Sequence, residues 1–266
     1  MPEGHTVHRI AGEFRAKFVG RPVKLSSPQG RFASEAAALD GLILAKSYAI
    51  GKQMFLVFGP NVTVRIHLGI YGKWRIESKR DGVAPVPVGQ VRVRFENDDF
   101  YADLRGPTAC EVIADDQVAV LRLKAGPDPL NPDPQGAEMA RFVDRVRSSR
   151  TTIGQLLMNQ DAVSGIGNVY RAELLFRAGI DPHRPGSSLS TDVLEAIWFD
   201  AVKLLKVGVA KGIMITRDEY LRKQPKFEDR YFVYKREGLP CRICGTAITI
   251  ELMATRKLYW CVRCQS

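Results

Sequence analysis

The sequence has no long apolar run. None of its apolar stretches reaches 18 residues, which is about the minimum length of a membrane-spanning helix. The first residues also lack the apolar segment of a secretion signal. Four charged residues interrupt them: Glu3, Arg9, Glu13 and Arg15. We therefore expect no membrane partner and a location in the cytoplasm.

Cysteine is almost absent from the first 240 residues, where Cys110 stands alone. Without a secretion signal, disulfide bonds are not expected, and we interpret Cys110 as a small buried apolar residue. The other four cysteines form two CxxC pairs separated by 16 residues: Cys241, Cys244, Cys261 and Cys264. This spacing is typical of a structural four-cysteine zinc site, with an iron–sulfur cluster as the alternative.

The segment between the two cysteine pairs, TAITIELMATRKLYW, alternates in polarity as the strands of a hairpin do. We therefore predict a zinc ribbon that holds one Zn2+. In such a ribbon the metal folds the segment and takes no part in chemistry. Arg256 and Lys257 lie on this hairpin.

Negative charge is scarce towards the C-terminus. The chain carries a net charge of +10, and residues 203–266 hold 14 basic and 6 acidic residues, which leaves only +2 for the rest. A basic surface concentrated in this way suits a polyanion, most simply nucleic acid. A solvated basic surface without a partner is the alternative.

Short β-rich segments fill the first part of the chain, up to about residue 112. Gly, Pro or Asn separates them: VKLSS, LILAKSYAI, QMFLVF, VTVRIHL, KWRIES and VRVRFEN. This pattern predicts a β-sandwich or barrel. A helix is predicted before them, over residues 5–20, ending at Gly20. Its apolar stripe consists of Val7, Ile10, Phe14 and Phe18.

A Pro- and Gly-rich segment, residues 126–136, separates the strands from a helical region. Four stretches carry helical periodicity: AEMARFVDRVRSS, TTIGQLLMNQ, GNVYRAELLFRAG and STDVLEAIWFDAVKLLKVGVAKG. We predict that Thr151 and either Ser190 or Thr191 are N-caps, and that Gly179 ends a helix.

Two glycine-containing turns have the chemistry of phosphate sites. In SGIGNVYRAELL the glycines break one helix, and Asn168 begins the next, which predicts a helix–turn–helix. A helix N-terminus after such a turn favours an anion. The second turn, Gly51–Lys52, lies between two predicted strands.

The chain resembles the formamidopyrimidine-DNA glycosylase/endonuclease VIII family along essentially its whole length. Five features match in order: the PEG start, the GK turn, IHLGIYGKW, SGIGNVYRAELLFRAGI and YKREGLPCRICG…TRKLYWCVRCQ. The resemblance implies a multidomain α+β fold. Its domains would be a β-sandwich catalytic domain at 1–125, a helix-two-turn-helix domain at 126–215 and a zinc ribbon at 216–266.

The resemblance also implies an activity and a partner. It predicts a bifunctional DNA glycosylase/AP lyase of base excision repair that acts on damaged DNA. We expect a monomer that associates with the nucleoid.

The resemblance assigns roles to five residues. Pro2 matches the family's N-terminal nucleophile, and Glu3 matches its catalytic acid. Lys52 matches a lysine that projects into the active site and contacts a DNA phosphate. Asn168 and Arg256 match the residues that grip phosphates near the lesion.

The start of the chain suits this chemistry. A secondary amine can attack C1′ of the damaged nucleotide and form a cationic imine, analogous to lysine Schiff bases. The imine acidifies the C2′ proton, so β-elimination, with δ-elimination as a further step, cuts the strand. Pro2 offers this amine only after Met1 is removed. Glu3 can donate a proton to the opened sugar.

A base inside a duplex must be flipped out, and an apolar or aromatic side chain fills the gap. Ile70 and Tyr71 match the wedge positions of the family, although strand alternation would bury one of the two. His67 is a candidate phosphate contact, with a structural role as the alternative.

One departure from the family pattern bears on the substrate. Arg105 matches the arginine of a second wedge loop in the formamidopyrimidine branch, but the phenylalanine of that loop is missing from DLRGPTACEV. Tyr71 instead resembles the endonuclease VIII arrangement, which favours oxidised pyrimidines over 8-oxoguanine. Residues 217–234 stand where the first branch has a lesion-covering loop and match neither branch.

A second function fits part of the sequence. The basic C-terminal region and the ribbon also suit a non-catalytic zinc-ribbon protein that binds damaged or single-stranded DNA. Only the N-terminus discriminates between the two functions, because the imine requires a free amine on Pro2.

Overall fold

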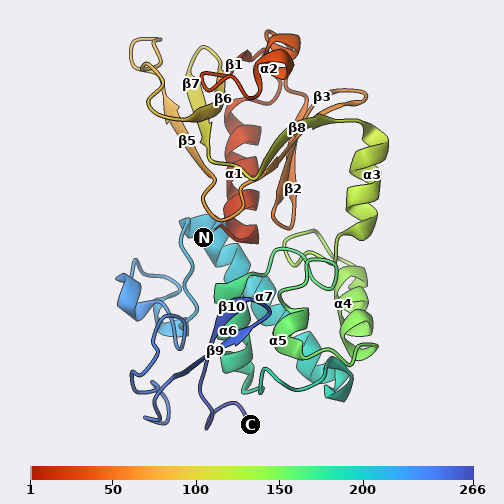
Figure 1. Cartoon of the computed structure of the whole chain (residues 1–266), viewed down its shortest axis with the longest axis vertical. Coiled ribbons are helices and arrows are strands. Elements are labelled where there is room, and N and C mark those ends of the chain that lie inside the picture. Colours follow the sequence, from red (N-terminus) through yellow and green to blue (C-terminus); the bar gives the residue numbers. More distant parts are fainter. Residues whose placement is uncertain (1) are drawn as a thin grey trace. The chain divides into compact units, whose positions relative to one another are not determined.

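The computed structural model describes residues 2–266 and divides into two compact units. The first unit ends at Lys124, and the second spans Ala125–Ser266. Figure 1 shows the elements of each unit. A further division of the second unit at residue 216 stays a prediction. Among the described residues, no helix combines the length and the apolar character needed to cross a membrane.

Two four-stranded antiparallel sheets form the first unit. One sheet has the order β1 (Lys24–Ser26), β6 (Val91–Glu96), β7 (Phe100–Arg105) and β5 (Lys73–Ser78). The other has the order β2 (Lys46–Ile50), β3 (Gln53–Gly59), β4 (Val62–His67) and β8 (Ala109–Ile113). Buried residues of both sheets belong to one apolar core, which confirms the predicted sandwich.

Helix α1 (Gly4–Lys17) joins both sheets. The ring of Phe14 contacts Trp74 of β5 and Phe95 of β6, with centroids 4.8 and 5.4 Å apart. On the other side, the Ser47 hydroxyl of β2 donates to the Ala11 carbonyl at 2.9 Å. The helix ends before the predicted Gly20, and these contacts fix the position of the residues that precede it.

Two helices of the first unit carry little sequence signal. In α2 (Ala33–Leu39) only Ala36 and Leu39 are buried. Helix α3 (Asp115–Lys124) buries none of its residues. Helical periodicity in a sequence reflects the burial of one helix face. These two helices bury little, so their sequences do not show a clear helical period.

The second unit is helical, with a terminal hairpin. Its elements are α4 (Ala137–Arg147), α5 (Ile153–Leu156), α6 (Asn168–Ala178), η1 (Gly186–Ser188), α7 (Thr191–Lys211), η2 (Asp218–Tyr220), η3 (Phe227–Asp229), β9 (Thr249–Met253) and β10 (Arg256–Trp260). The Ser190 side chain accepts a hydrogen bond from the Val193 amide as the N-cap of α7. Gly179 ends α6 in the left-handed conformation, with φ 67°. Both capping predictions are confirmed.

The predicted helix at residues 151–160 is wrong in length and in its cap. Helix α5 is a single turn, and its N-cap is Thr152 rather than Thr151. The chain then turns around the side chain of Gln160, which donates to the Met158 and Ile166 carbonyls and accepts from the Gly165 amide. Side-chain bonds of this kind compete with helical bonds of the backbone.

Candidate active site and nucleic-acid interface

Pro2 and Glu3 stand directly before α1. Glu3 is its N-cap in an extended conformation, and its carbonyl accepts from the Thr6 amide at 2.9 Å. The Glu3 side chain is fully buried, whereas Pro2 is partly exposed. A carboxylate at a helix N-terminus lies at the positive end of the helix dipole. Because α1 is packed on both sheets, the core fixes this pair of residues.

Lys52 lies on the two-residue turn between β2 and β3, where Ile50 pairs with Gln53. Gln53 also pairs with His67, the last residue of β4. Lys52, His67 and the turn after β4 therefore lie at one end of the second sheet. Figure 1 shows the β2–β3 turn at the same end of the first unit as the start of α1.

The ring of His67 has a defined orientation, because its Nδ1 accepts from the Gly69 amide at 3.1 Å. Burial, with the nearby cations Arg65 and Lys52, lowers the pKa of His67. The ring is therefore neutral near pH 7, with its proton on Nε2. His67 can donate one hydrogen bond to a phosphate oxygen but brings no charge.

Ile70 and Tyr71 are both exposed, at 43% and 84% of their surface. The alternative, in which one of them is buried in the core, is wrong, because they lie in the turn between β4 and β5 and not on a strand. This turn is tight: a Cβ added to Gly72 would lie 2.2 Å from the Leu68 carbonyl oxygen. The two apolar side chains are therefore held away from the core.

Arg105 is bound within the first unit, to its own strand and to the loop between β5 and β6. Its guanidinium donates to the Val88 carbonyl at 3.0 Å and to the Asp103 carboxylate at 3.0 Å. Asp103 is buried between Arg105 and Arg94. These contacts give Arg105 a structural role at the end of β7.

Asn168 and the β9–β10 hairpin come together in the second unit. Asn168 is the first residue of α6 and is 7% exposed. Its Nδ2 donates to the Lys257 carbonyl at 2.9 Å. Arg256, the first residue of β10, is exposed beside this contact. Two predicted phosphate contacts that are far apart in sequence are thus neighbours.

The four ribbon cysteines form one cluster, with all four Sγ atoms within 4.8 Å of one another. The Cys241–Cys264 and Cys244–Cys261 sulfur distances are 3.9 and 3.5 Å. In a tetrahedral site with metal–sulfur bonds of about 2.3 Å, the sulfurs are about 3.8 Å apart. The cluster fits a metal ion with four thiolate ligands.

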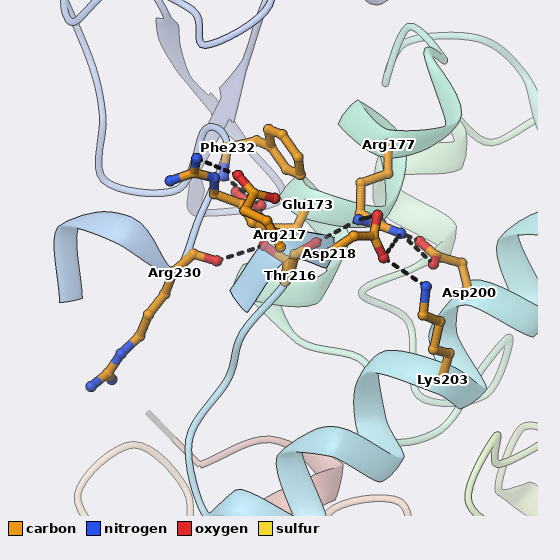
Figure 2. Close-up of polar contacts among 10 residues, drawn as sticks. Glu173, Arg177, Asp200, Lys203, Thr216, Arg217, Asp218, Arg230 and Phe232 are labelled. Carbon is orange, nitrogen blue, oxygen red and sulfur yellow. Dashed lines mark hydrogen bonds and ion pairs between the residues drawn. The ribbon is translucent and has the colours of Figure 1, made fainter. Parts of the chain in front are cut away.

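Glu173, on α6, is a buried charged residue that the sequence analysis missed. Its fully buried carboxylate accepts from the Thr216 hydroxyl and from the backbone N–H groups of residues 232–234. Burial raises the pKa of Glu173. The Thr216 amide also donates to the Arg230 carbonyl, at 3.0 Å. These bonds hold the two ends of the segment between Thr216 and Arg230 together (Figure 2).

A second cluster fastens the start of this segment to α7. Figure 2 shows Arg177 between the carboxylates of Asp200 and Asp218, at 2.6 and 2.9 Å. Lys203 of α7 also contacts Asp218, at 2.6 Å. One sequence signal points to Glu173 and Arg177. They are charged residues of a helix, α6, in which every residue from Asn168 to Phe176 is buried.

Two family models match the chain. The formamidopyrimidine-DNA glycosylase N-terminal domain matches residues 1–110, and the formamidopyrimidine-DNA glycosylase H2TH domain matches residues 125–219. Together they cover more than half of the chain.

Curated relatives match over most or all of their length. Endonuclease 8 1 of Mycobacterium tuberculosis is 45% identical over 271 residues, covering all of both chains. Formamidopyrimidine-DNA glycosylase of Geobacillus kaustophilus is 38% identical over 95% of this chain and 84% of its own length. Endonuclease 8 of Escherichia coli is 27% identical over all of both chains.

Solved structures share the fold. MutM in complex with DNA containing carbocyclic 8-oxo-G has a TM-score of 0.79 at 22% identity, over all of both chains. Lactococcus lactis Fpg in complex with DNA containing an abasic site has a TM-score of 0.80 at 23% identity, over 99% of each chain.

Proposed function

The chain belongs to the formamidopyrimidine-DNA glycosylase/endonuclease VIII family, and we propose that it excises oxidised pyrimidines through an imine at Pro2. It is a DNA glycosylase and AP lyase of base excision repair that removes oxidised bases. This activity replaces the alternative of a non-catalytic DNA-binding protein.

The observation that carries the proposal is the arrangement at one end of the first unit. α1 fixes Pro2 and the buried Glu3 there, and the β2–β3 turn brings Lys52 to the same end. The turn after β4 adds Tyr71, which is 84% exposed. A nucleophile, an acid, a cation and an aromatic wedge are the groups that base removal from a duplex requires.

The chemical steps follow from these groups. The Pro2 nitrogen attacks C1′ as the C1′–base bond breaks, and the base leaves with a proton. Glu3 protonates the ring oxygen of the sugar, so the ring opens and a cationic imine forms. The Glu3 carboxylate, which has given up its proton, then takes the C2′ proton, and the 3′ phosphate leaves by β-elimination. Met1, which must be absent for this step, lies outside the described residues.

We propose phosphate contacts from both units. Lys52 contributes a charge from the first unit, and Asn168 and Arg256 contribute from the second. His67, neutral near pH 7, would donate one further hydrogen bond from Nε2. Tyr71, with Ile70 beside it, would fill the gap left by the flipped base.

The preference for oxidised pyrimidines rests on the turn after β4. Tyr71 is its most exposed side chain, and Arg105, the match to the other branch's wedge, is bound within the first unit. The 45% identity with an endonuclease 8 favours the same branch.

The remaining proposals concern the metal and the assembly. The four ribbon cysteines could hold a metal ion, and we assign it as a single structural Zn2+, because closed four-thiolate sites are typical of zinc. We propose a monomer that acts on damaged DNA in the cytoplasm, at the nucleoid.

A panel of duplexes tests the substrate class. Each duplex carries thymine glycol, 5-hydroxycytosine or 8-oxoguanine at one position, and both ends at the nick are analysed. We expect the oxidised pyrimidines to be excised at least about 10-fold faster than 8-oxoguanine, with β-elimination products. Faster excision of 8-oxoguanine would contradict the assigned branch.

A further inference from the structure

Arg171 is a fully buried arginine at the junction of α6 and the β9–β10 hairpin. One of its terminal nitrogens, Nη2, donates to the Asn168 side-chain oxygen. The same nitrogen lies 3.4 Å from the Lys257 carbonyl oxygen. The other nitrogen, Nη1, lies 3.4 Å from the Met253 carbonyl oxygen and 3.5 Å from that of Gly154. One guanidinium thus connects α5, α6 and both strands of the hairpin.

These contacts fix which way the Asn168 amide faces. Its oxygen accepts from Arg171, and its nitrogen donates to the Lys257 carbonyl. Only one amide orientation satisfies both bonds, because the oxygen cannot donate and the nitrogen cannot accept. The second N–H of Asn168 is the group that we assign to a phosphate oxygen. Without Arg171, only the bond to the Lys257 carbonyl would still hold the amide in this orientation.

Arg171 also spans the turn that precedes Arg256. The two turn residues, Ala254 and Thr255, both have positive φ, of 50° and 62°. Hairpin turns of this type favour Asn or Gly, and a β-branched residue is disfavoured there. Such a conformation persists only where surrounding groups enforce it. Arg171 contacts the carbonyls of Met253 and Lys257, one on each side of this turn.

The hairpin is also packed closely against α5. A Cβ added to Gly154 would lie 2.6 Å from the Met253 sulfur and 2.9 Å from the Pro182 carbonyl oxygen. This close packing holds Met253, the last residue of β9, directly before the turn. The packing and the buried Arg171 together therefore enforce the conformation of the turn.

We propose that Arg171 is a positioning residue that couples Asn168 and Arg256 into a single phosphate-binding unit. It acts by orienting the Asn168 amide and by holding the turn from which Arg256 projects. The proposal rests on the proposed contacts of Asn168 and Arg256 with DNA. Lysine cannot replace arginine here, because an ammonium lacks the planar fork that reaches Asn168 and both strands at once.

A double-mutant cycle tests this coupling. Binding is measured by fluorescence anisotropy on a duplex with a non-cleavable tetrahydrofuran abasic analogue, for Arg171→Lys in the wild-type background and in a variant that carries both Asn168→Ala and Arg256→Ala. We expect Arg171→Lys to weaken binding about 10-fold in the wild-type background and less than about 2-fold in the Asn168→Ala/Arg256→Ala background, where both of its targets are absent. Wild-type affinity in Arg171→Lys, or losses that multiply in the combined variant, would overturn the proposal.

A matched control separates positioning from folding. Arg94→Lys makes the same change at another buried arginine, 4% exposed and bound to Asp103 in the first unit. It should leave DNA affinity within about 2-fold of wild type, because Arg94 contacts neither Asn168 nor the hairpin. At saturating DNA, Arg171→Lys should retain the wild-type rate of lesion excision, since the defect lies in binding.

A measurement on the unaltered protein covers the case in which Arg171→Lys does not fold. With 15N-labelled arginine, we expect the two terminal nitrogens of Arg171 to give separate NMR signals with slowly exchanging protons. A single averaged signal would overturn the proposal. Coupling without any lesion cleavage would contradict only the proposed function, and cleavage without coupling would contradict only the role of Arg171.

Discussion

At the scale of single residues, two ionisable side chains are buried at the start of α1. Glu3 is fully buried, and His5, two residues later, is 3% exposed. Burial lowers the pKa of His5 to about 4. The imidazole is therefore neutral near pH 7, and its Nε2 lies 3.1 Å from the Thr6 hydroxyl. A neutral ring adds no second cation beside the Pro2 amine.

The lowered pKa of His5 predicts a pH-dependent stability. Below an ordinary histidine pKa of about 6.5, the unfolded chain takes up a proton that the folded chain refuses. Stability from the neutral ring is thus complete above pH 6.5 and is lost as the pH falls towards 4. We expect denaturant titrations to show a loss of about 3 kcal/mol over this range that His5→Gln lacks. Equal pH profiles for the two proteins would contradict the burial of a neutral ring.

The turn after β4 predicts unequal effects for its two exposed residues. Because Tyr71 is 84% exposed and Ile70 is 43% exposed, Tyr71 is expected to enter the duplex further. Tyr71→Ala should slow single-turnover excision at least about 10-fold while changing the unfolding free energy by less than about 0.5 kcal/mol. Ile70→Ala serves as the comparison and should slow excision less. The reverse order would assign the wedge to Ile70.

At the scale of elements, the hairpin presents its arginine from a turn that α5 and α6 enforce. Arg256→Ala should reduce the slope of log affinity against log salt by about 1, because one phosphate contact is lost. The matched control is Arg263→Ala, since Arg263 is exposed on the same ribbon but lies outside the hairpin. Equal slopes for wild type and Arg256→Ala would place Arg256 away from the DNA backbone.

The elements differ in how far the sequence could predict them. Strands with alternating burial, such as β2, and helices with one buried stripe, such as α1, have a sequence period that reflects their packing. Helix α3 buries nothing and has no such period. Strand alternation would bury one of Ile70 and Tyr71, but alternation does not apply to a turn, and both side chains are exposed.

The cysteine spacing is diagnostic and can be recognised locally, whereas Pro2 and Glu3 are assigned through the family resemblance. Arg171 and Glu173 bind backbone groups that lie about 60 to 90 residues away, around the hairpin and residues 232–234. No local pattern encodes such partners, and charges within a helix usually indicate an exposed face.

At the scale of the whole molecule, the proposed nucleophile Pro2 and the four-cysteine cluster lie in different compact units. Removing the metal with a chelator should release one Zn2+ per chain, unfold the hairpin and weaken DNA binding at least about 10-fold. The core of the first unit should stay folded, because no ribbon cysteine belongs to it.

Two substitutions sharpen the zinc experiment. Cys261→Ser should lose the metal, whereas Cys110→Ser should retain it, because Cys110 lies in the first unit. Metal content by a colorimetric assay and binding to a duplex give the two readings. Full DNA affinity after complete loss of zinc would contradict the role of the ribbon in presenting Arg256.

The proposed function depends above all on a covalent imine between the Pro2 amine and the damaged nucleotide. This imine can be measured by borohydride trapping of the protein, with Met1 removed, on a duplex that contains thymine glycol, followed by peptide mapping of the adduct. We expect a single reduced adduct on Pro2, and a Pro2→Gly variant that loses far more of the adduct than of its DNA affinity. An adduct on another residue, or none from a protein that binds the same duplex, would contradict it.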